Sequence, residues 1–298
     1  MTPLCALVKR NIKLYFKDKG MFFTSLITPL ILLVLYGTFL SNVYEDTFRN
    51  ALEAAGASAP DQLIGGCVGG ELTSSLLAVC CVTVAFCSNF LMVQDKVTGA
   101  RGDLTMAPVK QGTLALGYYV ANLLSTLLVC WGAVAVCLLY LSQVGWYLTA
   151  GDVGLLLLDV LLLVLFGSAL SSSINFFLSS QGQISAVGTI VSAGYGFLCG
   201  AYMPISQFSD GLQKVISFLP GTYGTSLLRN HMLRGVFQEM LDRDFPVQVV
   251  EAIKDSVDCN LYFFGNPVEQ GAMYLVLGGS VAALIVLYLL LNLLRRRK

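Results

Sequence analysis

Residues 196–232 read GFLCGAYMPISQFSDGLQKVISFLPGTYGTSLLRNHM, and this stretch decides which fold the chain can adopt. It begins as the end of a long apolar run, breaks at Pro204, turns amphipathic, and breaks again at Pro220. Proline has no N–H to donate, so each proline is expected to end or kink a helix. The stretch is too apolar for an ordinary surface loop and too polar to cross a membrane. It predicts an apolar helix that stops at one membrane face, and a segment that stays at that face.

The composition agrees with a chain that lies in a membrane. Of its 298 residues, 56% are hydrophobic and only 12% are charged, about half the charged fraction of a soluble domain. Its apolar blocks reach the roughly 20 residues that a helix needs to cross a bilayer. We expect an all-α integral membrane protein with six transmembrane helices. The six expected spans are residues 21–43, 64–93, 113–142, 153–178, 184–203 and 271–294.

The segments outside these spans differ in character. Residues 2–18 place an apolar stripe opposite Lys9, Arg10, Lys13 and Lys17, which predicts an amphipathic helix lying in the membrane interface. The other expected segments are an outside loop at 44–63, a polar segment at 94–112, a tight inner turn at 179–183, the re-entrant region at 204–232 and an acidic amphipathic external segment at 233–268.

The basic residues are distributed unevenly along the chain. Twelve of the eighteen lie within residues 9–19, 96–110 and 295–298. These three segments share one side of the membrane if the chain crosses six times. Because lysine and arginine are enriched in cytoplasmic segments, the pattern places both termini in the cytoplasm.

Motifs for catalysis or metal binding are missing from the sequence. It contains no GxxxxGK[ST], HExxH or GxSxG, so we expect no catalytic residue and no nucleotide bound by a P-loop. One histidine and no CxxC argue against a metal site. Most of the nine cysteines lie in apolar blocks, where cysteine is usually a small packing residue. A disulfide formed by Cys259 is a less favoured alternative.

Three polar residues need an explanation. Asp159 lies within LLLLDVLLLVLF, where a carboxylate costs about 2.5–3.5 kcal/mol on insertion scales and should face protein or water. It could line a cavity or relay protons. Alternatively, the fourth span starts later, or Asp159 is protonated and bonded to a neighbouring helix. Glu71 is expected near the outer end of the second span, and His231 at the outer membrane edge as a polar cap.

Three segments in order resemble the permease subunit of a type-2 ABC exporter, the ABC-2 type transporter family. KRNIKLYFKDKGMFFTSLITPLILLVLYG resembles the family's interfacial elbow helix running into the first span. QDKVTGARGDLTMAPVKQGTLALGYYVANLL resembles its cytoplasmic turn between spans two and three. The stretch quoted first is similar to its signature after span five, with Pro204 and Pro220 followed by Arg229 and His231.

The resemblance implies an assembly and a location. It implies two separate ATPase subunits that bind MgATP, a second permease copy that is identical or homologous, no nucleic acid, and the plasma membrane of a bacterium. The segment at 94–112 would carry the motion of the ATPases into the spans. Its candidate coupling residues are Asp95, Lys96, Arg101, Asp103, Pro108 and Lys110.

The resemblance also implies a transport pathway formed mainly by the second and fifth spans, with re-entrant helices capping its outer exit. The candidate pathway residues are Ser74, Ser75, Thr83, Asn89, Ser185, Thr189, Ser192 and Tyr195. Few of the residues on these spans are charged, so we expect an amphipathic or apolar cargo such as a drug, lipid or peptide, with a polysaccharide as an alternative. A proton-coupled secondary transporter using Asp159 is the main rival, and an intramembrane enzyme is a weaker one.

Overall fold

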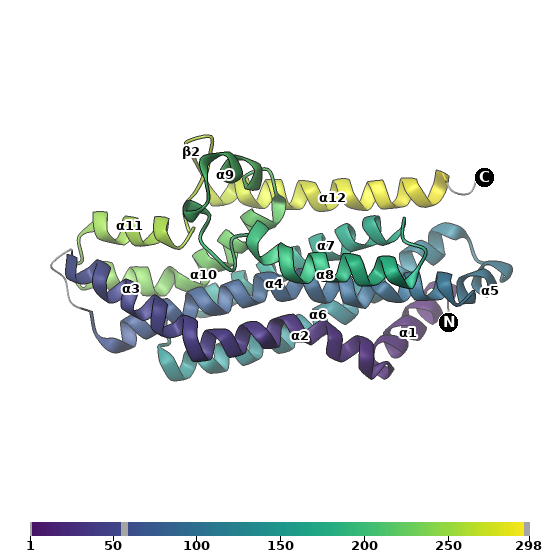
Figure 1. The fold of residues 1–298 in the computed structure, drawn as a ribbon, viewed down its shortest axis with the longest axis horizontal. Helices are drawn as coiled ribbons and strands as arrows, with labels where there is room; N and C mark the ends of the chain where they lie inside the picture. Colours follow the sequence, from purple (N-terminus) through teal and green to yellow (C-terminus); the bar gives the residue numbers. More distant parts are fainter. Residues whose placement is uncertain (1, 55–58, 295–298) are drawn as a thin grey trace.

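The computed structural model describes residues 2–54 and 59–294, which form a bundle of long helices and one short β-hairpin (Figure 1). The first half of the chain forms α1 (Pro3–Lys17), α2 (Lys19–Leu35), the π-helical turn η1 (Tyr36–Leu40), α3 (Ser41–Ala54), α4 (Asp61–Val97), α5 (Ala100–Met106) and α6 (Gln111–Val144). The second half forms α7 (Ala150–Asn175), α8 (Gln181–Leu198), the 3-10 turn η2 (Ile205–Gln207), α9 (Asp210–Ile216), α10 (Pro220–Asp242), α11 (Val247–Ser256), β1 (Leu261–Phe263), β2 (Asn266–Val268) and α12 (Gln270–Leu294).

Five helical segments of the described chain are long and apolar enough to cross a membrane. They are Lys19–Asn50, Asp61–Val97, Gln111–Val144, Ala150–Asn175 and Gln270–Leu294. The expected fifth span, 184–203, corresponds to α8 and is not among the five. The 18 residues of α8 span about 27 Å, close to the roughly 30 Å hydrocarbon core, but its glutamines, serines and glycines make it less apolar than the five segments. The structure therefore supports an all-α membrane protein but does not confirm six spans.

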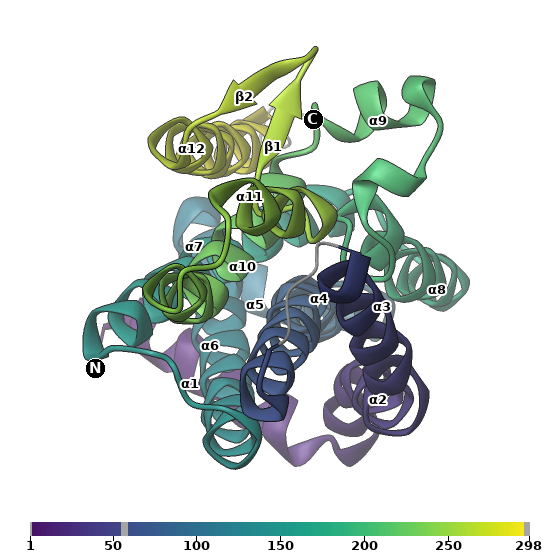
Figure 2. The same cartoon turned by 90° about the vertical axis from the view of Figure 1, so that its left-hand side faces the viewer.

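The bundle is built around α4, whose apolar residues are distributed over all of its faces. The most apolar part of α4 is entirely buried, and α2, α6, α7, α8 and α10 pack against it. Figure 2, an end-on view, shows α4 enclosed by these helices. With 37 residues, α4 is about 55 Å long and extends beyond the expected span 64–93.

The two ends of the bundle carry different elements (Figure 1). One end carries α1, α5 and the last turn of α12, and we call it the α5 end. The opposite end carries α3 and α11, and we call it the α3 end. The first helix and the end of α12 thus lie at the same end of the bundle (Figure 1), and the cytoplasmic location of this end stays a prediction. The basic residues 295–298 lie outside the described residues.

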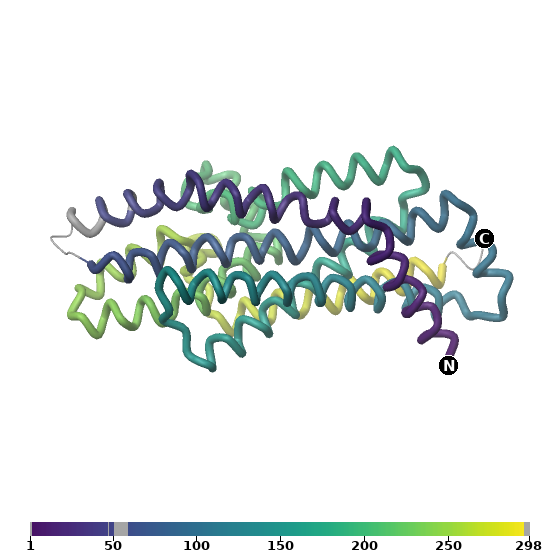
Figure 3. The backbone as a smooth tube through the Cα atoms, turned by 90° about the horizontal axis from the view of Figure 1, so that it is seen from below, coloured from purple at the N-terminus to yellow at the C-terminus, as the bar shows by residue number. Residues whose placement is uncertain are grey.

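The helix predicted at residues 2–18 is present as α1. Its stripe of Leu7, Asn11 and Tyr15 is buried, and the helix crosses the bundle obliquely (Figure 3). Asp18 ends α1, and its side chain accepts a hydrogen bond from the amide of Met21 at 3.0 Å. The same residue therefore caps α2 and fixes the turn between the two helices. That α1 lies in the membrane interface stays a prediction.

Several expected boundaries are wrong. The loop predicted at 44–63 is helical as far as Ala54, because Phe48 is still buried on the face of α3 that packs on α4. The turn predicted at 179–183 lies between Asn175 and Gln181. The re-entrant boundary at 232 falls inside α10, which continues to Asp242.

A β-hairpin was not predicted at all. Strands β1 and β2 are antiparallel, with Leu261 opposite Val268. The short strands are joined by Phe264 and Gly265, and both of these residues have positive φ angles, 50° and 83°. Two-residue turns of this kind usually place asparagine or glycine at such positions. Gly265 fits this preference and Phe264 does not, so the sequence only partly indicates the turn.

Candidate functional site

At the α5 end, Asp95 in the last turns of α4 is the centre of a polar junction. Arg10 of α1 donates hydrogen bonds to Asp95 Oδ2 at 2.7 Å and to Oδ1 at 3.1 Å. The hydroxyl of Tyr118 on α6 donates to Asp95 Oδ2 at 2.6 Å. Hydrogen bonding to Asp95 raises the pKa of the Arg10 guanidinium. The junction ties α1, α4 and α6 together at one buried carboxylate.

The next residue, Lys96, makes a different connection. Its Nζ donates to the backbone carbonyls of Asn175, Phe176 and Leu178, each at 2.8 Å. These carbonyls end α7, where helix carbonyls lack partners and carry partial negative charge. Lys96 therefore fastens α4 to the turn between α7 and α8. The sequence predicts a coupling role for this residue. In the structure, its ammonium group binds backbone carbonyls of the same chain.

The remaining candidate coupling residues lie on and after α5. Gly99 has φ of 84°, which lets the chain turn sharply between α4 and α5. Asp103 and Met106 are exposed, and Met106 is 87% exposed. Arg101 is half-buried, whereas Pro108 and Lys110 are exposed. This short helix presents a mixed apolar and charged surface at the end of the bundle.

A groove of about 1040 Å³ lies between α2, α4 and α8. Ser185, Thr189 and Ser192 of α8 line it, opposite apolar residues of α2. Asp18, where α1 meets α2, is the only charged residue among its lining residues. The groove thus has a mainly apolar lining with scattered hydroxyl groups.

The candidate pathway residues of α4 lie elsewhere. Ser74, Ser75, Thr83 and Asn89 are all buried against helices of the same chain. The Asn89 amide donates to the hydroxyls of Ser171 and Ser172 at 3.1 and 2.9 Å. The α4 and α8 candidates therefore do not meet in one cavity of the single chain. Tyr195, the last candidate on α8, has its hydroxyl directed at Gly221 of α10.

A second groove, of about 630 Å³, lies between α3, α11 and the segment 202–207. It shares Leu40 and Tyr202 with the first groove. The Tyr202 hydroxyl donates to the carbonyl of Ser192 at 3.1 Å. Tyr202 therefore lies where the two grooves adjoin, a position that the local sequence does not indicate.

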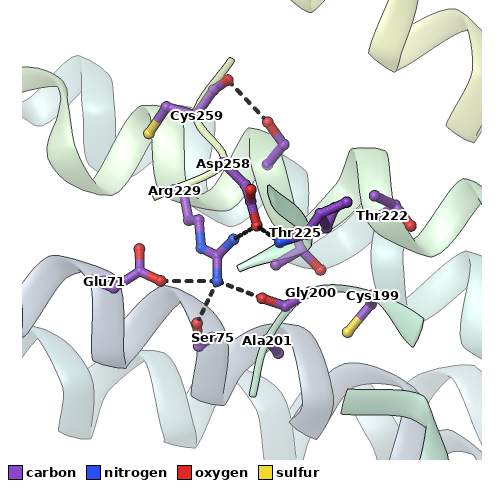
Figure 4. A network of polar contacts seen from close by, with 12 residues as sticks. Glu71, Ser75, Cys199, Gly200, Ala201, Thr222, Thr225, Arg229, Asp258 and Cys259 are labelled. Carbon is purple, nitrogen blue, oxygen red and sulfur yellow. Dashed lines mark hydrogen bonds and ion pairs between the residues drawn. The ribbon is translucent and has the colours of Figure 1, made fainter. Parts of the chain in front are cut away.

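Arg229 of α10 lies at the centre of a buried polar network (Figure 4). Its Nη2 lies 2.8 Å from Glu71 Oε1 and donates to the carbonyl of Gly200 at 2.7 Å. The same nitrogen donates to the hydroxyl of Ser75 at 3.0 Å, and Nη1 donates to Asp258 Oδ2 at 3.1 Å. Burial raises the pKa of Asp258, and the Arg229 charge opposes that shift. One side chain thus joins α4, the end of α8, α10 and the segment before β1.

A second buried cluster joins α7, α10 and α12. His231 Nδ1 lies 2.5 Å from Asp159 Oδ2, and the hydroxyl of Tyr274 donates to Asp159 Oδ1 at 2.6 Å. Asp159 is thus bonded to side chains of two neighbouring helices, α10 and α12, which is one of the alternatives that the sequence leaves open. His231 is only 4% exposed and is covered by neighbouring helices, and its position at the outer membrane edge stays a prediction.

Cys259 lies beside the Arg229 network. Its thiol is free and buried, as are those of the cysteines within the long helices. The backbone carbonyl of Cys259 accepts hydrogen bonds from Ser226 and Asn230 of α10. In the structure, Cys259 therefore holds its segment on α10 through its backbone.

Comparison with known families gives one match. The family model described as ABC-2 type transporter matches residues 2–233, a segment that runs from α1 into α10. No curated protein matches the chain. The matched segment includes the polar junction at Asp95, the three helices that form the first groove, and the two residues Glu71 and Arg229.

Proposed function

The chain belongs to the ABC-2 type transporter family, and on that premise we propose that it is the membrane-spanning subunit of an ATP-driven exporter. Two copies, identical or homologous, enclose the pathway, and two separate ATPase subunits that bind MgATP dock at the α5 end. The membrane is the bacterial plasma membrane, and both termini lie in the cytoplasm. The position of α1, α5 and the end of α12 at one end of the bundle supports this orientation (Figure 1).

The observation that carries the proposal is the path of contacts from α5 to the groove. A force applied to α5 reaches α4 through the turn at Gly99. In the last turns of α4, Asp95 holds α1 and α6, while Lys96 holds the turn that leads into α8. Because α8 forms one wall of the groove, a displacement of α5 moves that wall.

The lining of the groove supports an amphipathic or apolar cargo, such as a drug, lipid or peptide. Apolar side chains from α2 and α8 supply most of the surface, and hydroxyl groups such as that of Thr189 supply polar contacts. Ligand sites of this kind bind by apolar burial, with a few polar groups setting orientation. A strongly charged solute would leave its charge unpaired there, which is costly in a low-dielectric groove.

The test begins with purification of the tagged full-length chain in mild detergent, expressed with its chromosomal neighbours. An ATP-hydrolysing protein should accompany it in equal amount. Met106→Asp should then release this protein or abolish cargo-stimulated ATP hydrolysis, because Met106 is 87% exposed on α5. The matched control is Val247→Asp on α11, at the α3 end, where the side chain is 59% exposed. A chain that purifies alone and moves solute down a proton gradient would overturn the proposal.

A further inference from the structure

Three phenylalanine rings gather on the surface beside the start of α12. They are those of Phe218, which follows α9, and of Phe263 and Phe264 in the hairpin, and we call them the aromatic tip. The ring centroids of Phe218 and Phe263 are 5.3 Å apart, and those of Phe263 and Phe264 are 4.9 Å apart. The rings contact one another, yet Phe218 and Phe264 remain 63% and 55% exposed. The tip is thus a contiguous apolar projection, formed by two segments far apart in sequence.

The backbone at the tip adopts an unfavourable conformation at Phe264. Phe264 has φ of 50°, a conformation that bulky residues rarely adopt and that is unfavourable for them. Asparagine or glycine would form the same turn without this penalty. A phenylalanine at this position therefore needs an interaction that compensates for its conformation and its exposure.

The position of the tip identifies its surroundings. Only Glu269 separates β2 from α12. The 25 residues of α12 are about 37 Å long, so both ends of this span reach past the roughly 30 Å hydrocarbon core. Figures 1 and 2 agree that the hairpin projects sideways from the bundle, across the axis of α12. The tip therefore lies beside the bundle, at the depth expected for the membrane interface.

The two faces of the hairpin have opposite character. The hydroxyl of Tyr262 donates to Asp255 of α11 at 3.0 Å, and α11 lies toward the α3 end, away from the membrane core (Figure 1). Neighbouring strand residues point to opposite faces, so Phe263 points away from that polar contact. Apolar rings on the membrane side and a polar contact on the water side are the arrangement that aromatic residues adopt at bilayer interfaces.

We propose that the aromatic tip inserts into the headgroup region of the outer phospholipid leaflet and anchors the external segment beside α12. Helix α12 follows the hairpin directly in the sequence. Its surface is apolar and exposed, and Leu275, for example, is 78% exposed. The tip also lies on the side of the bundle away from α2 (Figure 2). Contact with lipid, rather than with a second permease copy, is consistent with both observations.

The test places a fluorescent probe at the tip of the full-length protein. Trp131 and Trp146 are replaced by phenylalanine, and Phe264→Trp is added, with Phe218→Trp as a second probe. Each variant is reconstituted in phosphatidylcholine nanodiscs whose acyl chains carry bromine either near the headgroup or near the bilayer centre. Val247→Trp, on exposed α11, is the control. Native size-exclusion behaviour is required of every variant.

The proposal expects both tip probes to be quenched more strongly by the shallow bromines than by the deep ones, and to be less accessible to acrylamide than Val247→Trp. Quenching by acrylamide equal to that of the control, with no effect of bromine, would show that the tip lies in water and would overturn the proposal. Protection from bromine and acrylamide together would place the tip against a second copy, and would also overturn it. None of these readouts depends on ATP or cargo.

Discussion

Arg229 on α10 and Glu71 on α4 form a buried ion pair, with 2.8 Å between Nη2 and Oε1 and each side chain about 1% exposed. Arg229 also pairs with Asp258, so one cation serves two buried carboxylates. Unpaired buried charges are costly, because the surrounding protein cannot replace the water they lose. Helix α10 is therefore held on the central helix α4 by an ion pair as well as by apolar packing.

Replacing this arginine should destabilise the protein strongly. Arg229→Met leaves Glu71 and Asp258 buried without a counter-charge, and loss of one partner of a buried pair typically costs about 3–5 kcal/mol. We expect a large drop in the apparent melting temperature, measured by fluorescence-detected size exclusion. Arg243→Met is the control, since Arg243 is 44% exposed and pairs with Glu239, which is 33% exposed. The double variant Arg229→Met/Glu71→Gln should recover part of the loss, and equal melting temperatures for the two single variants would contradict the interpretation.

Asp159→Asn separates a structural from a proton-relaying function of the second cluster. The substitution weakens the contact with His231 but keeps an acceptor for Tyr274. We expect a loss of stability of about 1–3 kcal/mol, and ATP-driven transport that persists in reconstituted vesicles without a pH gradient. Tyr274→Phe, which removes only a hydroxyl, should cost less. Loss of transport in Asp159→Asn with an unchanged melting temperature would instead support the proton-coupled rival.

The contact between Arg10 and Asp95 should transmit motion from α1 to α4. Arg10→Ala leaves Asp95 with Tyr118 as its remaining side-chain partner, and losing a hydrogen bond to a charged group costs about 1.5–3 kcal/mol. Because Arg10 is partly exposed, we expect the lower end of that range. Cargo-stimulated ATP hydrolysis should fall while the ATPase still copurifies. Lys13→Ala, an exposed basic residue on the same helix, is the control, and an equal effect in both variants would argue against a specific role for Arg10.

Filling the first groove should block transport. Thr189→Trp places a large ring among the lining residues of α8, and should lower transport to near background while stability and ATPase binding change little. Ile190→Trp is matched in size and adjacent in sequence, but Ile190 is 69% exposed and is not a lining residue. Transport measured in vesicles should therefore distinguish the two. Full activity in Thr189→Trp would show that the cargo passes elsewhere.

The groove also illustrates which features of the site could be predicted. The hydroxyl residues of α8 were predicted as pathway residues, and Ser185, Thr189 and Ser192 do share one groove. The α4 candidates are predicted on the same grounds, but polar and apolar residues of α4 are mixed around the helix without a periodic face. Composition therefore could not indicate that Ser74 and Asn89 face other helices of the same chain.

The same reasoning explains the missed ion pairs. The sequence predicts Glu71 near the outer end of the second span and Arg229 after the second proline, but 158 positions separate the two residues in sequence. Whether they meet depends on which faces of α4 and α10 pack together. Small residues help to decide this, because a Cβ on Gly70 of α4 would lie only 2.5 Å from a methyl group of Leu233 on α10.

The sequence by itself determined the class of the protein and the positions of several helix ends. Long apolar blocks can satisfy their backbone hydrogen bonds in lipid only as helices, so the membrane class and most long helices follow from local composition. The prolines act locally too. Pro204 precedes the turn η2, and Pro220 begins α10, because proline lacks the N–H that a helix interior requires.

Only the tertiary structure decided the contacts between helices and the conformation of the segments that connect them. It extends α3 beyond the expected span, pairs Asp159 with His231, and uses Lys96 to hold the end of α7. It also forms a hairpin from residues with only a partial turn signal. Each of these outcomes depends on partners distant in sequence, whose contacts compensate for buried charge or strained backbone, and a local pattern of residues carries no information about such partners.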